Sequence, residues 1–249
     1  MRLSAEVALV GGGTHSGFGL SPGPDCHVYL LESRGEAALI DCGLGTPASR
    51  EAVLAHISES GIRPTAITRL LLTHYHADHS GGAARWRETL GLEVAIGAEG
   101  ADAVECGDLD ATGLTRAKQS GIYDPDYEQL ACPVDHRLSD GEQISVGDLT
   151  VTYISTPGHC RGHGAFYVTG GEKTYLFTGD CVLHGGRILL QNIPDCDIDE
   201  YSRSVGRLNQ LEFDCLLPGH GAIALADGRL HVAKAARAFE GVGLPPGRF

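Results

Sequence analysis

The stretch Leu70–Gly82, LLLTHYHADHSGG, places four potential metal ligands directly after a run of leucines. These ligands are His74, His76, Asp78 and His79. Three leucines in a row fit a buried strand, and the end of a rigid strand fixes the base of the loop that follows it. Imidazole and carboxylate ligands suit zinc, iron or manganese better than calcium or magnesium. The stretch therefore predicts a transition-metal site at the end of a strand.

Three later motifs have the same form, an apolar run followed by glycine and a ligand. His159 lies in STPGHCRGH, Asp180 in FTGDC and His220 in LLPGHG. Because each ligand follows an apolar run, all of them could come from one edge of the sheets. Together with the first stretch they supply five histidines and two aspartates, which is what two metal ions that share a carboxylate and a water need.

Apolar runs between glycines and prolines predict strands and helices in both halves of the chain. We expect strands over 27–33, 36–43, 68–73, 92–97, 149–156, 164–170, 173–180 and 213–219, and helices over 47–62, 81–91, 197–211 and 228–240. Runs of strands with interspersed helices fit an α/β protein with two sheets and outer helices. We treat residues 1–249 as one domain.

The middle of the chain differs in composition. Between Glu99 and Glu142 there are 11 acidic and 3 basic residues, a net charge of −8. We expect an insertion around 100–136 to form a lid over the site, with Tyr123 and Tyr127 lining a pocket. The alternative is a solvated acidic excursion. If the lid interpretation holds, its charge should favour neutral lactones or esters over anionic substrates.

The composition of the chain limits the kinds of molecule that the protein can be expected to bind. A net charge of −13 over 249 residues argues against a nucleic-acid surface. The sequence contains no run of 18 apolar residues, so we expect no membrane-spanning helix. Eight cysteines without a CxxC pair, and no secretory signal, favour reduced thiols in the cytoplasm. The expected partner is a small carbonyl compound, and the sequence leaves a homodimer open.

The HxHxDH motif and the later His, Asp and His resemble the signature of the metallo-β-lactamase fold superfamily, with a dinuclear site like that of glyoxalase II and the lactonases. The resemblance implies an αββα sandwich. It also implies a ligand set for two divalent ions, zinc in the first place, with iron or manganese as alternatives. By resemblance, His74, His76 and His159 hold the first ion, Asp78, His79 and His220 hold the second, and Asp180 bridges both.

The resemblance also implies a reaction. A water between two cations becomes a hydroxide at neutral pH and can attack the carbonyl of a small lactone, ester or thioester. Asp78 would orient that hydroxide as well as bind metal. The alternative is an oxidoreductase similar to persulfide dioxygenase, which binds one iron through His74, His159 and Asp180.

Four further residues carry weaker expectations. His184, four residues after Asp180, is a candidate acid for the leaving group, or else an exposed loop residue. Cys160 and Cys181 directly follow predicted ligands, and we expect them to be packing thiols. His15 lies in a glycine-rich loop that either borders the pocket or only connects its neighbours.

Overall fold

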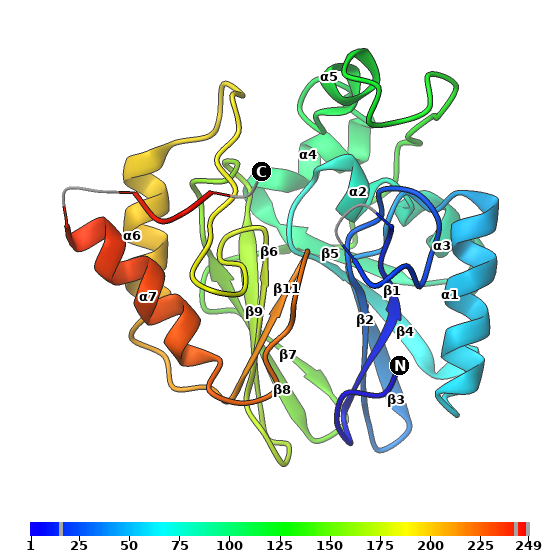
Figure 1. Ribbon diagram of the computed structural model, residues 1–249. Helices are drawn as coiled ribbons and strands as arrows, with labels where there is room; N and C mark the ends of the chain where they lie inside the picture. Colours follow the sequence, from blue (N-terminus) through cyan, green and yellow to red (C-terminus); the bar gives the residue numbers. More distant parts are fainter. Residues whose placement is uncertain (15–16, 242–243, 248–249) are drawn as a thin grey trace.

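The computed structural model describes residues 1–14, 17–241 and 244–247. Two mixed β-sheets pack face to face, with helices on the outer face of each (Figure 1). The strand order is β1-β2-β3-β4-β5-β6 in the first sheet and β11-β10-β9-β8-β7 in the second. This arrangement confirms the predicted αββα sandwich. The strands are β1 (Val7–Gly11), β2 (Val28–Ser33), β3 (Glu36–Ile40), β4 (Ile67–Leu72), β5 (Glu93–Gly97), β6 (His136–Leu138), β7 (Gln143–Val146), β8 (Leu149–Ser155), β9 (Gly164–Thr169), β10 (Tyr175–Gly179) and β11 (Cys215–Pro218).

Strand direction decides where the loops meet. In the first sheet β3, β4, β5 and β6 run parallel, so the carboxyl ends of β3, β4 and β5 share one edge. In the second sheet β7 to β10 are antiparallel, but β11 runs parallel to β10. The loops after β10 and β11 therefore begin at the same edge.

The helices cover the two outer faces. They are α1 (Pro47–Glu59), η1 (Pro64–Ala66), α2 (Ala77–Ser80), α3 (Ala83–Leu90), α4 (Ala98–Cys106), α5 (Leu114–Gln119), α6 (Ile198–Leu208) and α7 (Arg229–Glu240). Figure 1 shows α6 and α7 on the side of the second sheet, and α1 and α3 on the side of the first. Buried Trp86 of α3 donates a hydrogen bond to the Cys42 carbonyl at 3.1 Å. The inner layer between the sheets buries aromatic residues such as Tyr29, Phe166 and Phe177.

The structure adds elements that the apolar pattern does not predict. β1 is five residues long and buried along its whole length, so it shows no alternation to mark it as a strand. β6 and β7 are three and four residues long. In the middle of the chain, α4 buries Ala101 and Val104 in the core beneath the first sheet. The beginning of the 100–136 segment is thus part of the outer helical layer.

Three further expectations concern membrane spans, the cysteines Cys160 and Cys181, and His15. No helix in the described ranges is both long and apolar enough to cross a membrane. Cys160 and Cys181 are fully buried among apolar side chains, as expected for packing thiols. His15 lies outside the described residues.

Candidate metal centre

The structure brings all seven predicted ligands to one edge of the sandwich. The loop after β4 carries His74 and His76, and the short helix α2 carries Asp78 and His79. His159 lies between β8 and β9, while Asp180 and His220 follow β10 and β11 within two residues. Their convergence follows from the strand directions described above.

The first cluster consists of His74, His76 and His159, whose ligand atoms lie within 4.8 Å of one another. The Nε2 atom of His159 is 3.0 Å from Nδ1 of His76. Burial, and then the neighbouring His159, lower the pKa of His76 to about 3, and burial also lowers the pKa of His74 and His159. The three imidazoles are therefore neutral at pH 7, with lone pairs available to a cation.

The second cluster consists of Asp78, His79 and His220, which also lie within 4.8 Å of one another. The Nε2 atom of His220 is 3.1 Å from Oδ2 of Asp78 and 3.3 Å from Nε2 of His79. This cluster contains one carboxylate and two imidazoles, a ligand set that suits a divalent transition metal.

Asp180 lies between the two clusters. Its Oδ1 atom is 3.4 Å from Nε2 of His79 and 3.5 Å from Nε2 of His220. Its Oδ2 atom is 3.6 Å from Nε2 of His159. One oxygen thus faces each cluster, which is the arrangement that the predicted bridge requires.

Asp41, which sequence reasoning missed, contacts His79 of the second cluster on the side of the ring away from the other ligands. Its carboxylate accepts hydrogen bonds from Nδ1 of His79, from the backbone nitrogen of Thr73 and from the Thr73 hydroxyl, each at 2.8 Å. The bond to Nδ1 fixes the proton there and leaves Nε2 of His79 to face the site. Asp41 follows β3 with a φ of +57°. Its role depends on the pairing of β3 with β4, so no local motif marks it.

His163 is a second buried residue that sequence reasoning missed, although it stands in the same motif as His159. Its Nε2 atom accepts a hydrogen bond from the backbone nitrogen of Asp180 at 3.1 Å, and its Nδ1 lies 2.8 Å from the Thr156 hydroxyl. The residue thus fixes the backbone of Asp180 rather than facing a metal. Spacing alone does not distinguish the two roles.

A cavity of about 680 Å³ opens above the clusters. The site contributes His76, Asp78, Asp180 and His220 to its wall. The middle segment contributes Thr112, Gly113, Arg116, Ala117, Ser120, Ile122 and Tyr123, and the loop after β10 contributes Leu189, Leu190, Gln191, Asn192 and Ile193. The Arg116 guanidinium donates to the Asn192 carbonyl, which joins the two walls.

Tyr123 and Tyr127 of the middle segment are both predicted from the sequence to line this cavity, and only one of them does. Both tyrosines pack in one small apolar cluster with Leu44, Ala77 and Leu114. Tyr123 also lines the cavity, whereas Tyr127 does not, and the Tyr127 hydroxyl donates to the Leu44 carbonyl at 2.8 Å. None of the acidic residues between 99 and 142 lines the cavity, and Arg116 does. The net charge of the segment therefore does not describe the charge that a substrate meets.

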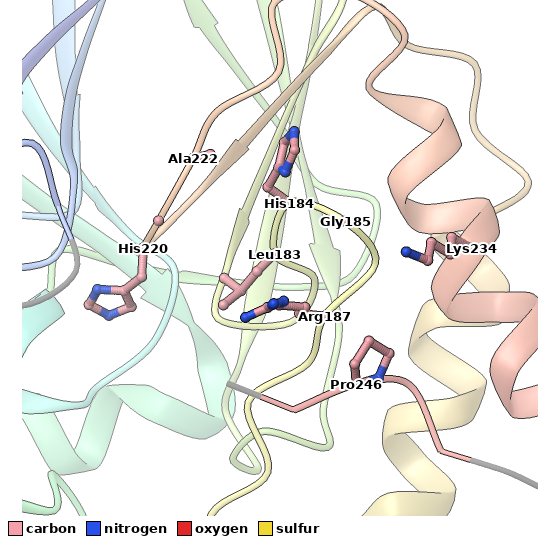
Figure 2. A pocket seen from close by; sticks show the side chains of 9 residues that line it. Leu183, His184, Gly185, Arg187, His220, Ala222, Lys234 and Pro246 are labelled. Carbon is pink, nitrogen blue, oxygen red and sulfur yellow. The ribbon is translucent and has the colours of Figure 1, made fainter. Parts of the chain in front are cut away.

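His184 lies apart from this cavity. The residue is exposed, and its ring packs against that of His231 with centroids 4.1 Å apart. It lines a second cavity of about 430 Å³, which shares His220 with the first (Figure 2). Its role as a leaving-group acid stays a prediction.

Two facing mixed sheets, outer helices and a histidine–aspartate centre at one edge define the metallo-β-lactamase fold. Residues 22–220 match the family model of the metallo-beta-lactamase superfamily, and the chain belongs to that superfamily. The fold implies divalent metal ions, and the two clusters fit such a site.

Several curated relatives are named as thioesterases. An atrochrysone carboxyl ACP thioesterase of Aspergillus fumigatus is 29% identical over 221 residues, which cover 89% of this chain and 58% of the relative. An acyl-coenzyme A thioesterase of Bos taurus is 28% identical over 214 residues, covering 80% of this chain and 74% of the relative. The chain spans a little over half the length of the fungal relative. These names support a hydrolase.

A solved structure gives the same fold. A metallo-beta-lactamase family protein of Thermus thermophilus has a TM-score of 0.72 and 26% identity, and the match covers 96% of this chain and 81% of that one.

Proposed function

We propose that the protein is a thioesterase that uses two divalent transition-metal ions, zinc in the first place, to hydrolyse a small acyl thioester. The observation that carries the proposal is the position of Asp180, with one carboxylate oxygen toward each of two ligand clusters. The names of the fungal and bovine relatives support the thioester among the carbonyl compounds that such a site could hydrolyse.

The residues present fit two metal ions. The Nε2 atom of His74 and Oδ1 of Asp180 are buried and have no hydrogen-bond partner among the described residues. An unpaired buried polar atom is costly, and a cation would satisfy both atoms. His74, His76 and His159 would hold one ion, Asp78, His79 and His220 the other, and Asp180 both. Bound ions of this kind lower the pKa of a water toward neutrality and polarise a carbonyl.

Tyr123 supplies a polar group to the cavity beside Asp78. Burial, and then the charge and hydrogen bonding of Asp78, raise the pKa of Tyr123 well above its usual value. The phenol therefore keeps its proton at neutral pH. It restrains the Asp78 carboxylate, and its ring gives the substrate an apolar surface.

Hydrolysis of a thioester needs little proton donation. The carbonyl carbon gains a bond to the oxygen of water and loses its bond to sulfur, and the sulfur leaves with the electron pair. Because a thiol has a pKa of about 8.5, the thiolate leaves without a general acid. The placement of His184 outside the first cavity is compatible with such a substrate, whereas an alcohol leaving from a lactone or ester depends more on an acid.

Elemental analysis and a substrate panel test the proposal together. Freshly purified protein should contain up to two transition-metal ions per chain, and His79→Ala should lose one of them. His136→Ala, a change at a half-exposed histidine on β6, is the matched control and should lose none. Acyl thioesters should be hydrolysed faster than lactones and oxygen esters with the same acyl group, and prolonged chelation should abolish the activity.

Two results would contradict the proposal. Full metal occupancy in His79→Ala would remove the second cluster as a metal site. A single bound iron, together with oxygen uptake on addition of a persulfide, would favour the dioxygenase alternative. The intact second cluster of Asp78, His79 and His220 argues for the hydrolase.

A further inference from the structure

The second cavity, of about 430 Å³, lies beside the metal centre, and its lining contains the cationic residues Arg187 and Lys234. It begins at His220, which it shares with the substrate cavity, and reaches Lys234 and Pro246 (Figure 2). Leu183, His184, Gly185, Arg187, His220, Gly221, Ala222, Lys234 and Pro246 line it. His220 is common to the two linings, so the two cavities adjoin at this residue.

Two cations face this cavity, and no carboxylate of the described residues forms an ion pair with either of them. Figure 2 shows the Arg187 guanidinium directed toward His220 and the Lys234 amino group directed from α7 toward the loop that carries Gly185. The Arg–carboxylate ion pairs among the described residues are made by other arginines, and neither Arg187 nor Lys234 lies within 4.0 Å of a carboxylate oxygen there. Two cations at one cavity, with no ion-pair partner among the described residues, attract an anion.

The segments that form the walls contain no acidic residue over long stretches. None occurs over 181–194, 219–226 or 229–239, although the chain has 32 acidic residues and a net charge of −13. The cavity is thus a local positive region on an acidic protein, and such a contrast concentrates anions at this place.

We propose that this second cavity binds the phosphate of a phosphopantetheine arm, the thiol half of an acyl thioester. The inference rests on the proposed thioesterase function. Arg187 would bind phosphate oxygens through its planar guanidinium, and Lys234 would add a second charge. Leu183, Ala222 and Pro246 offer apolar and small surfaces for the chain of the arm, and the acyl group stays over the clusters in the first cavity.

Calorimetric binding tests the inference independently of catalysis. The probes are 4′-phosphopantetheine and pantetheine, which have the same thiol and differ in the phosphate. Wild-type protein loaded with zinc should bind the phosphorylated probe about tenfold more tightly, as expected for a few partly exposed charge-assisted hydrogen bonds. The double variant Arg187→Ala/Lys234→Ala should bind the two probes equally. Arg237→Ala, one turn further along α7 and outside the cavity lining, should keep the wild-type ratio.

Coenzyme A and a phosphopantetheinylated carrier protein then distinguish the two sources of the arm. Coenzyme A binding tighter than 4′-phosphopantetheine points to the nucleotide form, whereas faster hydrolysis of the acyl carrier protein points to the protein-bound form. Equal affinity for phosphorylated and unphosphorylated probes in the wild type, or an unchanged ratio in the double variant, overturns the inference even if thioesters are hydrolysed. If the phosphate is bound but no thioester is hydrolysed, the proposed function fails instead.

Discussion

The Nε2 atom of His163 lies 3.1 Å from the backbone nitrogen of Asp180, and both groups are buried. The hydrogen bond fixes the chain at the point where β10 ends and Asp180, the proposed bridging ligand, follows. The Thr156 hydroxyl, 2.8 Å from Nδ1, accepts the other ring proton of His163 and so defines which nitrogen accepts from Asp180.

Replacing His163 should therefore weaken metal binding although the residue is not a ligand. We expect His163→Phe, which keeps a ring but removes the acceptor, to lower metal affinity by about 10- to 100-fold, as is typical of residues behind metal ligands. Titration of the apo protein with zinc and a competing chelator measures the change. His163→Asn, which keeps an acceptor, should recover part of the loss. Wild-type affinity in His163→Phe would remove the residue from the support of Asp180.

Gly219 lies where a side chain would enter the centre. A methyl group there would meet Cε1 of His79 at 2.6 Å and Oδ1 of Asp180 at 2.7 Å. We expect Gly219→Ala to lose metal and most activity, because two ligands would have to move apart. Elemental analysis and turnover check this expectation.

Gly206→Ala is the matched control for that change. Gly206 is exposed on α6, and nothing lies within 4 Å of a methyl group built on it. This control should keep both metal and activity, and it should stabilise the protein by about 0.5–1 kcal/mol, since alanine is the better helix former. Equal metal content in the two variants would show that the centre tolerates the added methyl group.

Two tyrosines in the middle segment should behave differently. Tyr123 lines the substrate cavity, and Tyr127 does not. We predict that Tyr123→Phe changes kcat/KM and the order of preference among thioesters, while Tyr127→Phe mainly lowers stability, by about 1 kcal/mol for one lost hydrogen bond. Kinetics on a thioester panel and denaturant unfolding separate the two effects. Identical substrate preference in wild type and Tyr123→Phe would support the view that this segment is only a solvated excursion.

The buried His27 gives the fold a dependence on pH. Burial, and then the electrostatic interaction with nearby His220, lower the pKa of His27 from 6.5 to about 3. Below pH 6.5 the unfolded chain therefore binds a proton that the folded chain does not, so the free energy of unfolding decreases as pH falls toward 3. Each such group contributes about 1.4 kcal/mol per pH unit over that range.

Replacement of His27 isolates that contribution. In a chelating buffer, where metal loss plays no part, the stability of His27→Asn should decrease less between pH 6.5 and 4.5 than that of the wild type, by about 2–3 kcal/mol. Denaturant unfolding at a series of pH values measures the slopes, and His136→Asn should match the wild type. Parallel slopes for His27→Asn and wild type would refute the assignment.

Much of the fold could be predicted because its signals are local. Strands such as β4 and β8 are apolar runs ended by turn residues, and α6 and α7 show apolar positions at helical spacing. The ligands stand directly after such strands, so their convergence at one edge needed only the strand directions. β1 could not be recognised, since a short strand buried on both faces has no periodic pattern.

Residues whose roles arise from tertiary contacts could not be predicted. Asp41 forms a hydrogen bond with His79, which lies 38 residues later in the sequence. The ring of His184 packs against that of His231, which lies 47 residues later. Arg187 and Lys234 are ordinary cations in the sequence and share a cavity only because α7 packs beside the loop after β10. The net charge of the middle segment also does not reveal which of its side chains line the cavity, and none of its acidic residues does.

The chain order of the ligands bears on the way a newly made molecule obtains its metal. The second cluster combines Asp78 and His79 with His220, which is positioned only when β11 has added to the edge of its sheet beside β10. During synthesis the HxHxDH segment leaves the ribosome long before that partner, so a complete centre cannot form until nearly the whole sandwich has assembled. We therefore expect the choice among zinc, iron and manganese to follow the metal supply at the place where folding ends, rather than at the place where the motif is synthesised.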